Sequence, residues 1–295
     1  MQDYDQIKQK IRQLTGQIEA ATDNKTLIAL KRELYKTKLE ALDAISQEEK
    51  RAGLTARELK AKVETKPLAV RYATGVLPLD EALEGGIETG TLVQLAGQSF
   101  TGKTHLTLEV LSNVAIYANA VMFNFEMGDA RIVKRLNGLL RHEEQWDNLI
   151  IDADTRSLQD LVMEISLYAR EGVRFFAIDS KMKIDVHHEK EDHKKFAAIT
   201  KELSKLVQQK EIIVFLINQM NEEDIKNKRL AFKGSGDQMY DTDIALFYTK
   251  SDDDLNRRTL ICPKNRQDEK QFSIDLMLDG NGKTVSAGEG YKYKK

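Results

Sequence analysis

The chain has 295 residues, 41% of them hydrophobic and 31% charged, so it can bury a large core beneath a well-solvated surface. Its net charge of −2 gives no general affinity for nucleic acid, and any such binding must depend on local basic patches. A single cysteine, Cys262, excludes an intrachain disulfide framework, and no apolar run approaches a membrane span, so we expect a soluble, cytoplasmic protein.

Residues 1–46 are expected to form a helical hairpin, in which two helices are joined by the polar turn at 22–26. Apolar residues at helical spacing mark the two stripes: Ile7, Ile11, Leu14 and Ile18, then Leu27, Leu30 and Leu34. The stripes are too narrow for a self-sufficient core, so the hairpin must pack on something. Either the rest of this chain or another subunit or protein would serve, and the sequence leaves both open.

Residues 47–70 are expected to be a linker that contains one short helix. Thr55 and Glu58 have the spacing of a capping box, and Leu59 and Val63 are the apolar positions that follow it. Pro67 then lies just past the expected end of the helix.

Residues 71–295 alternate between strand and helix patterns, which predicts one α/β domain with a mainly parallel sheet flanked by helices. The expected strands are the apolar runs at 92–96, 121–125, 149–151, 174–178, 212–217, 244–249, 258–262 and 272–278. The last two runs are joined by a polar segment, which predicts an antiparallel hairpin added to the edge of the sheet.

The segment "GQSFTGKT" fits the phosphate-binding loop pattern, and it lies between an expected strand and an expected helix. Its residues, the expected contacts of ATP, are Gly97, Gln98, Ser99, Phe100, Thr101, Gly102, Lys103 and Thr104. Lys103 would reach the β- and γ-phosphates, and the Thr104 hydroxyl would bind Mg²⁺. The alternative, a glycine-rich turn that binds nothing, is disfavoured by the strand–loop–helix setting.

Polar side chains end three other expected strands, where ligands of open α/β sheets bind. Asp179 ends "VRFFAID", where a Walker-B carboxylate would hold Mg²⁺; otherwise it is a helix cap. Glu126 follows a strand that we expect beside the phosphate-loop strand, where it could polarise the attacking water; otherwise it is a surface glutamate. Gln219 ends "VFLINQ", where it could sense the γ-phosphate or contact a second ligand.

Several segments together resemble the RecA-like ATPase domain of DnaB-type replicative DNA helicases. The entry to the phosphate loop, "TGVLPLDEALEGGIETGTLVQLAGQSFTGKT", is similar to that of RecA-like proteins in general. "FNFEMGDARIVKRL", "FFAIDSKMKI", "FLINQMNE", "GSGDQMYDTDIALFY" and "ICPKNRQ" resemble motifs of the helicase family, and they occur in the same order. The resemblance covers roughly residues 70–290.

The resemblance implies a role for individual residues of one site. Lys103 and Thr104 would bind phosphate and Mg²⁺, Glu126 would activate water, and Asp179 would order the metal. Gln219 would couple the γ-phosphate to contacts with DNA.

The resemblance also implies that Lys264 and Arg266 act in trans on the γ-phosphate of a neighbouring subunit. A finger supplied by a neighbour makes hydrolysis depend on assembly, so a homo-oligomeric ring is expected, most simply a hexamer. The resemblance implies that such a ring moves 5′ to 3′ on single-stranded DNA. Without the resemblance, both residues would lie in a solvated hairpin tip.

Three features depart from the helicase family. Its large N-terminal helical domain is missing or replaced by residues 1–46, which could contact a primase, a loader or another replication protein. The segment between Glu126 and the strand at 149–151 is short. Ser180 stands where we expect an aromatic residue.

Two segments are candidates for contact with single-stranded DNA. Residues 181–195 are lysine-rich and contain three histidines, which without cysteine predict a polar, mobile loop rather than a zinc site. In residues 226–233 the expected phosphate contacts are Lys226, Lys228, Arg229 and Lys233, with Phe232 available for stacking on a base.

Two other functions stay open. A recombinase of the RecA/RadA type would use the same fold as an open filament on single-stranded DNA. An ATP-dependent regulatory or interaction module would use the helical hairpin to recruit a partner and would not act on DNA.

Overall fold

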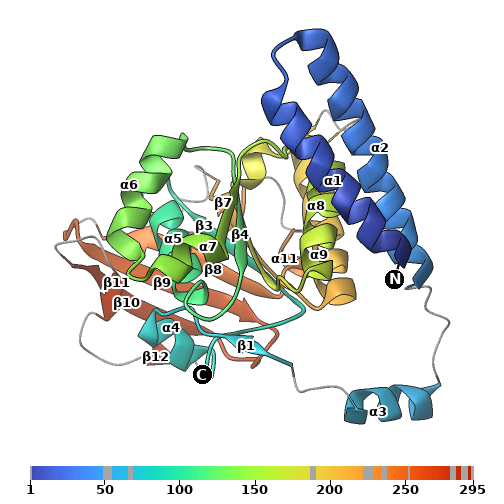
Figure 1. Cartoon of the computed structure of the whole chain (residues 1–295). Helices are drawn as coiled ribbons and strands as arrows, with labels where there is room; N and C mark the ends of the chain where they lie inside the picture. Colours follow the sequence, from blue (N-terminus) through green and yellow to red (C-terminus); the bar gives the residue numbers. More distant parts are fainter. Residues whose placement is uncertain are drawn as a thin grey trace. The chain divides into compact units, whose positions relative to one another are not determined.

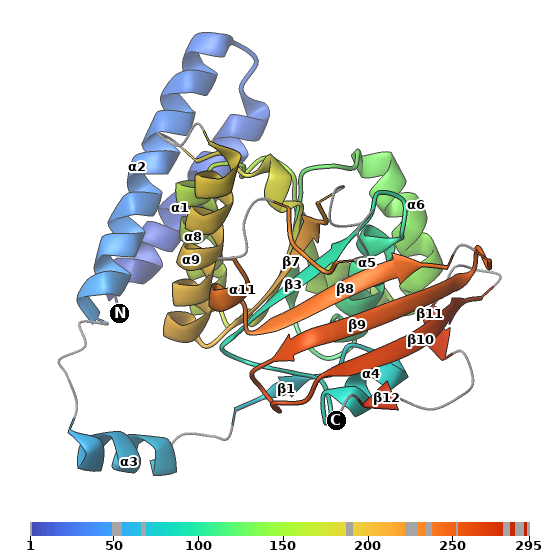
Figure 2. The same cartoon turned by 180° about the vertical axis from the view of Figure 1, so that it is seen from behind.

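Figures 1 and 2 show the computed structural model of the chain from two sides. The structure describes residues 2–48, 55–65, 69–186, 191–221, 229–233, 238–251, 253–279, 284–286 and 292–293. It divides into two compact units, Met1–Leu68 with Met163–Tyr168, and Ala69–Val162 with Ala169–Lys295. None of the described helices is long and apolar enough to cross a membrane.

The first unit contains the predicted helical hairpin, formed by α1 (Gln2–Ala20) and α2 (Asn24–Glu48), which lie side by side (Figure 1). Leu14 and Ala41 are buried within this unit, and Lys38 of α2 forms an ion pair with Glu164. The short third helix, α3 (Ala56–Thr65), begins at the predicted capping box, where the Glu58 carboxylate accepts the Thr55 N–H at 2.7 Å.

The second unit is built on a sheet that has ten strands among the described residues. Its strands are β3 (Thr91–Gly97), β4 (Ala120–Asn124), β5 (Leu149–Asp152), β6 (Phe175–Asp179), β7 (Ile213–Gln219), β8 (Ile244–Lys250), β9 (Arg257–Asn265), β10 (Phe272–Leu278), β11 (Thr284–Ser286) and β12 (Lys292–Tyr293). They lie in the order β11-β10-β9-β8-β3-β7-β6-β4-β5, with β12 also paired to β10. A separate antiparallel pair joins β1 (Arg71–Tyr72) to β2 (Ile87–Glu88).

The six strands from β8 to β5 pair in parallel, whereas β9 to β12 pair antiparallel at one edge. This arrangement confirms the predicted fold class. Each of the eight predicted strand segments corresponds to one of these strands. The runs of β3, β4 and β6 are apolar throughout because these strands are buried on both faces, whereas β9 and β10 alternate buried and partly exposed residues.

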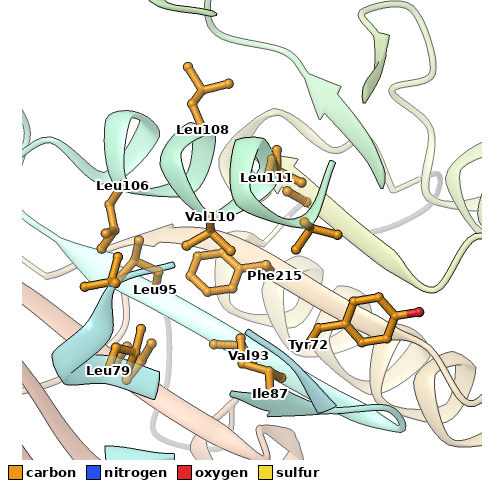
Figure 3. Close-up of a cluster of buried hydrophobic side chains, with 14 of the residues drawn as sticks. Tyr72, Leu79, Ile87, Val93, Leu95, Leu106, Leu108, Val110, Leu111 and Phe215 are labelled. Atoms are coloured by element: carbon orange, nitrogen blue, oxygen red, sulfur yellow. The ribbon is translucent and has the colours of Figure 1, made fainter. Parts of the chain in front are cut away.

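Helices cover both faces of the sheet. They are α4 (Leu77–Ala82), α5 (Lys103–Val114), α6 (Asp129–Leu139), α7 (Glu143–Asn148), α9 (Asp192–Lys210) and α11 (Gln238–Asp241), with a 3₁₀ turn, η1, at Lys181–Lys183. A further helix, α8 (Leu158–Arg170), begins and ends in this unit, and its residues Met163–Tyr168 belong to the first unit. Val93 and Leu95 of β3 pack with Leu106 and Val110 of α5 and with Phe215 (Figure 3). Since side chains alternate along a strand, Gln94 points to the other face.

Candidate nucleotide site

The phosphate loop connects β3 to α5 and needs both of its glycines. A Cβ on Gly97 would lie 2.4 Å from the carbonyl oxygen of Tyr248 in β8, and Gly102 has φ = 98°. Lys103 lies at the first position of α5, where its Nζ donates to the carbonyl oxygens of Gly97 at 3.0 Å and Gln98 at 2.7 Å. The ammonium is therefore held across the loop, beside the helix N-terminus that would face a phosphate.

The tip of the loop carries an aromatic residue on the surface. Phe100 is 99% exposed and has φ = 64°, a conformation that non-glycine residues seldom adopt. Gln98 and Ser99 beside it are also exposed, whereas Thr101 is buried.

Thr104 and Asp179 form a site that fits Mg²⁺. The Thr104 hydroxyl donates to Oδ2 of Asp179 at 2.6 Å, while Oδ1, among the described residues, is buried without a hydrogen-bond partner. Burial raises the pKa of Asp179 to about 6, since a buried carboxylate is costly without a compensating charge. A hard cation bound by oxygen ligands would supply that charge.

Glu126 is held beside Asp179 by the backbone. Asn124 of β4 pairs with Asp179 of β6, and the Phe125 N–H donates to the Asp179 carbonyl at 2.7 Å. The exposed Glu126 carboxylate accepts a hydrogen bond from the hydroxyl of Ser180. The serine that stands in place of the expected aromatic residue thus orients the candidate base.

One expectation about Glu126 was wrong. Its strand, β4, does not lie beside β3, because β7 and β6 come between them. Crossover connections can place consecutive strands apart in a sheet, and apolar periodicity contains no information about that order. The Glu126 side chain still lies at the site, because it accepts from Ser180, the neighbour of Asp179. Burial lowers the pKa of Lys103, and the nearby carboxylates of Asp179 and Glu126 oppose this lowering.

Gln219 lies next to the phosphate loop, since it pairs with Gly97 in the register of β7 and β3. Its carbonyl oxygen accepts the Lys233 N–H at 2.8 Å, and Met220 and Phe232 form an antiparallel bridge. The segment that leaves β7 at Gln219 therefore returns to the same point at Lys233.

The predictions for the two DNA-contact segments have mixed outcomes. Lys226 and Lys228 lie outside the described residues, whereas Arg229 and Lys233 are exposed. Phe232 is only 4% exposed and stacks on Phe247 with ring centroids 5.0 Å apart. It is therefore a core residue, and the prediction that it is available to stack on a base was wrong.

The prediction of a mobile loop over 181–195 was also wrong in part. Lys181 is 0% exposed, and residues 192–195 belong to α9. Among the histidines, His187 and His188 lie outside the described residues, and His193 contacts the Glu191 carboxylate at 3.3 Å. The partners that bury Lys181 lie far away in the sequence, so the polar composition of this segment gave no indication that the lysine is buried.

Lys264 and Arg266 lie at the amino ends of the parallel strands, which we call the amino edge of the sheet. The phosphate loop lies at the carboxyl ends of the same strands, the carboxyl edge. β9 runs antiparallel to β8, so Lys264 pairs with Ala245 at the start of β8. Arg266 contacts Asp243, whose backbone N–H donates to the carbonyl of Leu92 at the start of β3. From Leu92 to Gly97 a strand spans roughly 17 Å, so the pair lies far from the phosphate loop of its own chain.

The two cations are held by carbonyl oxygens of α11 and by one carboxylate. Lys264 Nζ donates to the carbonyls of Met239 and Tyr240, and Arg266 Nη2 donates to that of Tyr240 at 2.7 Å. Arg266 Nη1 lies 3.3 Å from Oδ1 of Asp243, and the arginine side chain is 50% exposed. Burial, followed by the nearby Arg266, lowers the pKa of Lys264.

The segment after Arg266 is anchored rather than solvated. The Gln267 amide donates to the carbonyls of Leu83 and Gly86, and Asp268 accepts from Arg71 at 2.9 Å. These contacts fix the connection between β9 and β10, and they disfavour the alternative of a free hairpin tip.

Sequence reasoning missed Arg258, which supports the phosphate loop from β9. It is 6% exposed, and its Nε donates to the carbonyl oxygen of Thr101 at 2.8 Å. A signal was present, since Arg258 falls in the same alternating phase as Leu260 and Cys262, which are also buried.

Comparison with known proteins agrees with this geometry. Residues 58–224 match the model of a family, AAA_25, described as an AAA domain, and the match covers more than half of the chain. The chain belongs to this AAA domain family. No curated protein matches the sequence.

Solved structures that resemble this AAA domain in fold include an ATPase domain, a helicase and a KaiC-like protein. One, described as an ATPase domain, has a TM-score of 0.68 at 19% identity, over 80% of this chain and 99% of the other. A "DnaB-Like Replicative Helicase", described with its interactions with primase, has a TM-score of 0.64 at 18% identity, over 95% and 76%. A KaiC-like protein of Pyrococcus horikoshii OT3 has a TM-score of 0.60 at 17% identity, over 74% and 99%.

These likenesses confirm the fold that the sequence motifs implied. This AAA domain has the RecA-like P-loop ATPase fold of DnaB-type helicases.

Proposed function

We propose that this chain is the core of a ring-forming, ATP-dependent DNA helicase that moves on single-stranded DNA during replication in the cytoplasm. One observation supports this most strongly, namely that the candidate catalytic groups occupy opposite edges of one sheet. Lys103, Asp179 and Glu126 lie at the carboxyl edge, whereas Lys264 and Arg266 lie at the amino edge.

This separation favours an active site completed between subunits. Arg266 is half-exposed and lies far from its own phosphate loop, so the phosphate it could reach belongs to another copy. Repeating such a head-to-tail contact generates a ring or a helical filament. We propose a closed ring, most simply a hexamer.

Each candidate residue then has one task. Lys103 binds the β- and γ-phosphates, and Thr104 and Asp179 hold Mg²⁺, which neutralises phosphate charge when bound. Glu126, oriented by Ser180, accepts the proton of the attacking water. Lys264 and Arg266 of a neighbour would offset the charge that develops on the transferred group.

Gln219 would link hydrolysis to DNA. It lies beside Gly97, and its carbonyl closes the base of the segment that contains Lys226, Lys228 and Arg229. A change at the γ-phosphate would therefore move these cations along the DNA backbone. The helical hairpin at 1–46 is the proposed contact for a primase, a loader or another replication protein.

A second candidate function is an ATP-dependent interaction module that does not act on DNA. The burial of Phe232 favours it, because the aromatic residue that could have stacked on a base belongs to the core. The net charge of −2 agrees with this alternative.

The deciding experiment is steady-state ATP hydrolysis with and without single-stranded DNA, combined with light scattering of the assembly. We expect DNA to stimulate hydrolysis and the mass to be that of a closed oligomer. Arg229→Ala/Lys233→Ala should weaken DNA binding and reduce its salt slope, whereas the control Lys201→Ala/Lys250→Ala should not. Hydrolysis indifferent to DNA would favour the interaction module, and open filaments would favour a recombinase.

A further inference from the structure

The core of the second unit contains a cluster of polar side chains on the face of the sheet opposite α5. We name it the polar cluster, and all of its residues are 0% exposed. Its members are Gln94, Lys181, Thr200, Asn218, Gln238 and Thr242. Most buried polar groups in proteins are hydrogen-bonded, so the hydrogen bonds of this cluster show which elements it connects.

Lys181 is the centre of the polar cluster. It follows Ser180 directly, and its Nζ donates to Oε1 of Gln238 at 2.6 Å, to Oε1 of Gln94 at 3.3 Å and to the Thr200 hydroxyl. An ammonium has three donors, and three neutral oxygens satisfy them here. The side chain thereby connects the end of β6, next to the metal site, with β3, α9 and α11.

The connection continues from Gln238 to the opposite edge of the sheet. Gln238 is the first residue of α11, and its carbonyl accepts the Thr242 hydroxyl at 2.7 Å. The Thr242 hydroxyl in turn accepts a hydrogen bond from the side-chain amide of Gln94. The carbonyls of Met239 and Tyr240, in the same short helix, hold Lys264 and Arg266.

A continuous series of contacts therefore crosses the sheet from one candidate half-site to the other. It begins at Asp179 and Ser180, passes through Lys181 and Gln238, and ends at Arg266. The same Gln238 amide donates to the Lys233 carbonyl at 3.0 Å, which ties the proposed DNA-contact segment to the series.

We propose that Lys181 is a positioning residue that links the nucleotide site of its own subunit to Lys264 and Arg266. The inference rests on the proposed function, in which these two cations complete the site of a neighbour. Displacement of Asp179 and Ser180 on binding or loss of the γ-phosphate moves Lys181, then α11, and then the carbonyls that hold the pair. Each subunit thus controls its neighbour through its own nucleotide.

The test is complementation between variants mixed in one assembly. Glu126→Gln has a defective base but intact Lys264 and Arg266, whereas Arg266→Ala has an intact base but no finger. A random equal mixture of the two places a competent base opposite a competent finger at about a quarter of the head-to-tail interfaces. Recovery of ATP hydrolysis in this reference mixture establishes action in trans.

Lys181→Met is then mixed with each of the two variants. We expect it to bind a fluorescent ADP analogue as the wild type does, to lose at least about tenfold in kcat, and to recover with Glu126→Gln but not with Arg266→Ala. The informative comparison is therefore which of the two partners restores hydrolysis.

In Lys181→Met the base is intact and the finger is misplaced, so its own active site should work when a neighbour presents an intact finger. Glu126→Gln supplies that finger, whereas Arg266→Ala does not. Recovery in the mixture with Arg266→Ala but not in that with Glu126→Gln would show that Lys181 supports the active site of its own subunit, and it would overturn the inference. Recovery with neither partner, or unchanged kcat, would also overturn it.

Two controls separate the possible failures. Lys201→Met removes an exposed lysine from α9, the helix that contains Thr200, and should behave as the wild type. Gln238→Ala cuts the link from the side of α11 and leaves Lys181 two of its oxygens, so it replaces Lys181→Met if that variant does not fold. If the reference mixture of Glu126→Gln and Arg266→Ala fails to recover, the proposed function fails, and the inference falls with it.

Discussion

The two edges of the central sheet use charge in different ways. At the carboxyl edge, Lys103, Asp179 and Glu126 converge, and a buried carboxylate oxygen of Asp179 has no partner in the described part of the chain. At the amino edge, Lys264 and Arg266 are already occupied by carbonyls and by Asp243. The first edge has an unsatisfied carboxylate oxygen that a cation could bind, whereas the second holds its two cations in place with oxygen acceptors of its own chain.

Removal of the arginine at the amino edge should have the largest effect. Arg266→Ala is expected to lower kcat by about 10³-fold, because a finger that stabilises charge in the transition state is worth about 10³ to 10⁵ in rate. Affinity for ATP should be unchanged, since the nucleotide binds at the other edge. Steady-state hydrolysis and equilibrium nucleotide binding measure the two quantities.

The control for this prediction is Arg257→Ala, which removes an exposed arginine from the opposite end of β9. It should leave kcat within about twofold of the wild type, as surface substitutions usually do. A comparable loss in both variants would show that charge on β9, rather than the position of Arg266, determines the rate.

At the carboxyl edge, Asp179→Asn should weaken the response to Mg²⁺ by about 10–100-fold, because a carboxylate that orients a metal contributes about that much to its affinity. A Mg²⁺ titration of hydrolysis at saturating ATP measures the shift. Asp152→Asn is the matched control, since Asp152 ends β5 at the same edge and accepts backbone N–H groups of a local turn. An equal response of both variants would exclude a metal role for Asp179.

Replacement of Arg258 tests whether β9, which leads to Lys264 and Arg266 at the amino edge, also supports the phosphate loop at the carboxyl edge. Arg258→Met should lower the free energy of unfolding by about 1–3 kcal/mol, because the Thr101 carbonyl loses its buried partner. The affinity for ATP should fall severalfold as the loop loosens, while the finger at the far end of β9 stays in place. Chemical denaturation and nucleotide binding report these effects, with Arg257→Met as the control. Wild-type affinity in Arg258→Met would remove Arg258 from the support of the loop.

The smallest effect concerns Cys262, which lies on β9 between the two edges. Burial raises its pKa to about 12, so at mildly alkaline pH the thiol stays protonated and inaccessible in the folded chain. Iodoacetamide should label it only as the protein unfolds, and mass spectrometry along a denaturant series would follow this. Labelling of the native protein at the rate of a free thiol would show that β9 opens locally.

Much of the fold could be predicted because its signals are local. The apolar runs of buried strands, the phosphate-loop pattern and the capping box at Thr55 each occupy a few consecutive residues. The order of strands was not local, so the neighbours of the Glu126 strand were predicted wrongly.

The environment of single residues was predicted less well. Lys181 and Phe232 each lie in a polar segment, yet their partners come from distant strands and helices. Arg258 is buried and donates a hydrogen bond to a carbonyl oxygen 157 positions away in the chain. Such pairings depend on tertiary proximity, which a single sequence does not contain, whereas the roles of the site residues stay predictions for the experiments above.

The course of β9 has a consequence for the timing of a whole assembly. Near one end of this strand Arg258 donates to the phosphate loop, and at the other end lie Lys264 and Arg266, which we propose to act on the next subunit. In a ring built this way, every subunit would supply its two cations to one neighbour and would use the cations of the other neighbour at its own nucleotide site. All contacts around the ring would therefore have the same direction. Successive hydrolysis events would then proceed around the ring in one direction, which the asymmetry of the single protomer determines.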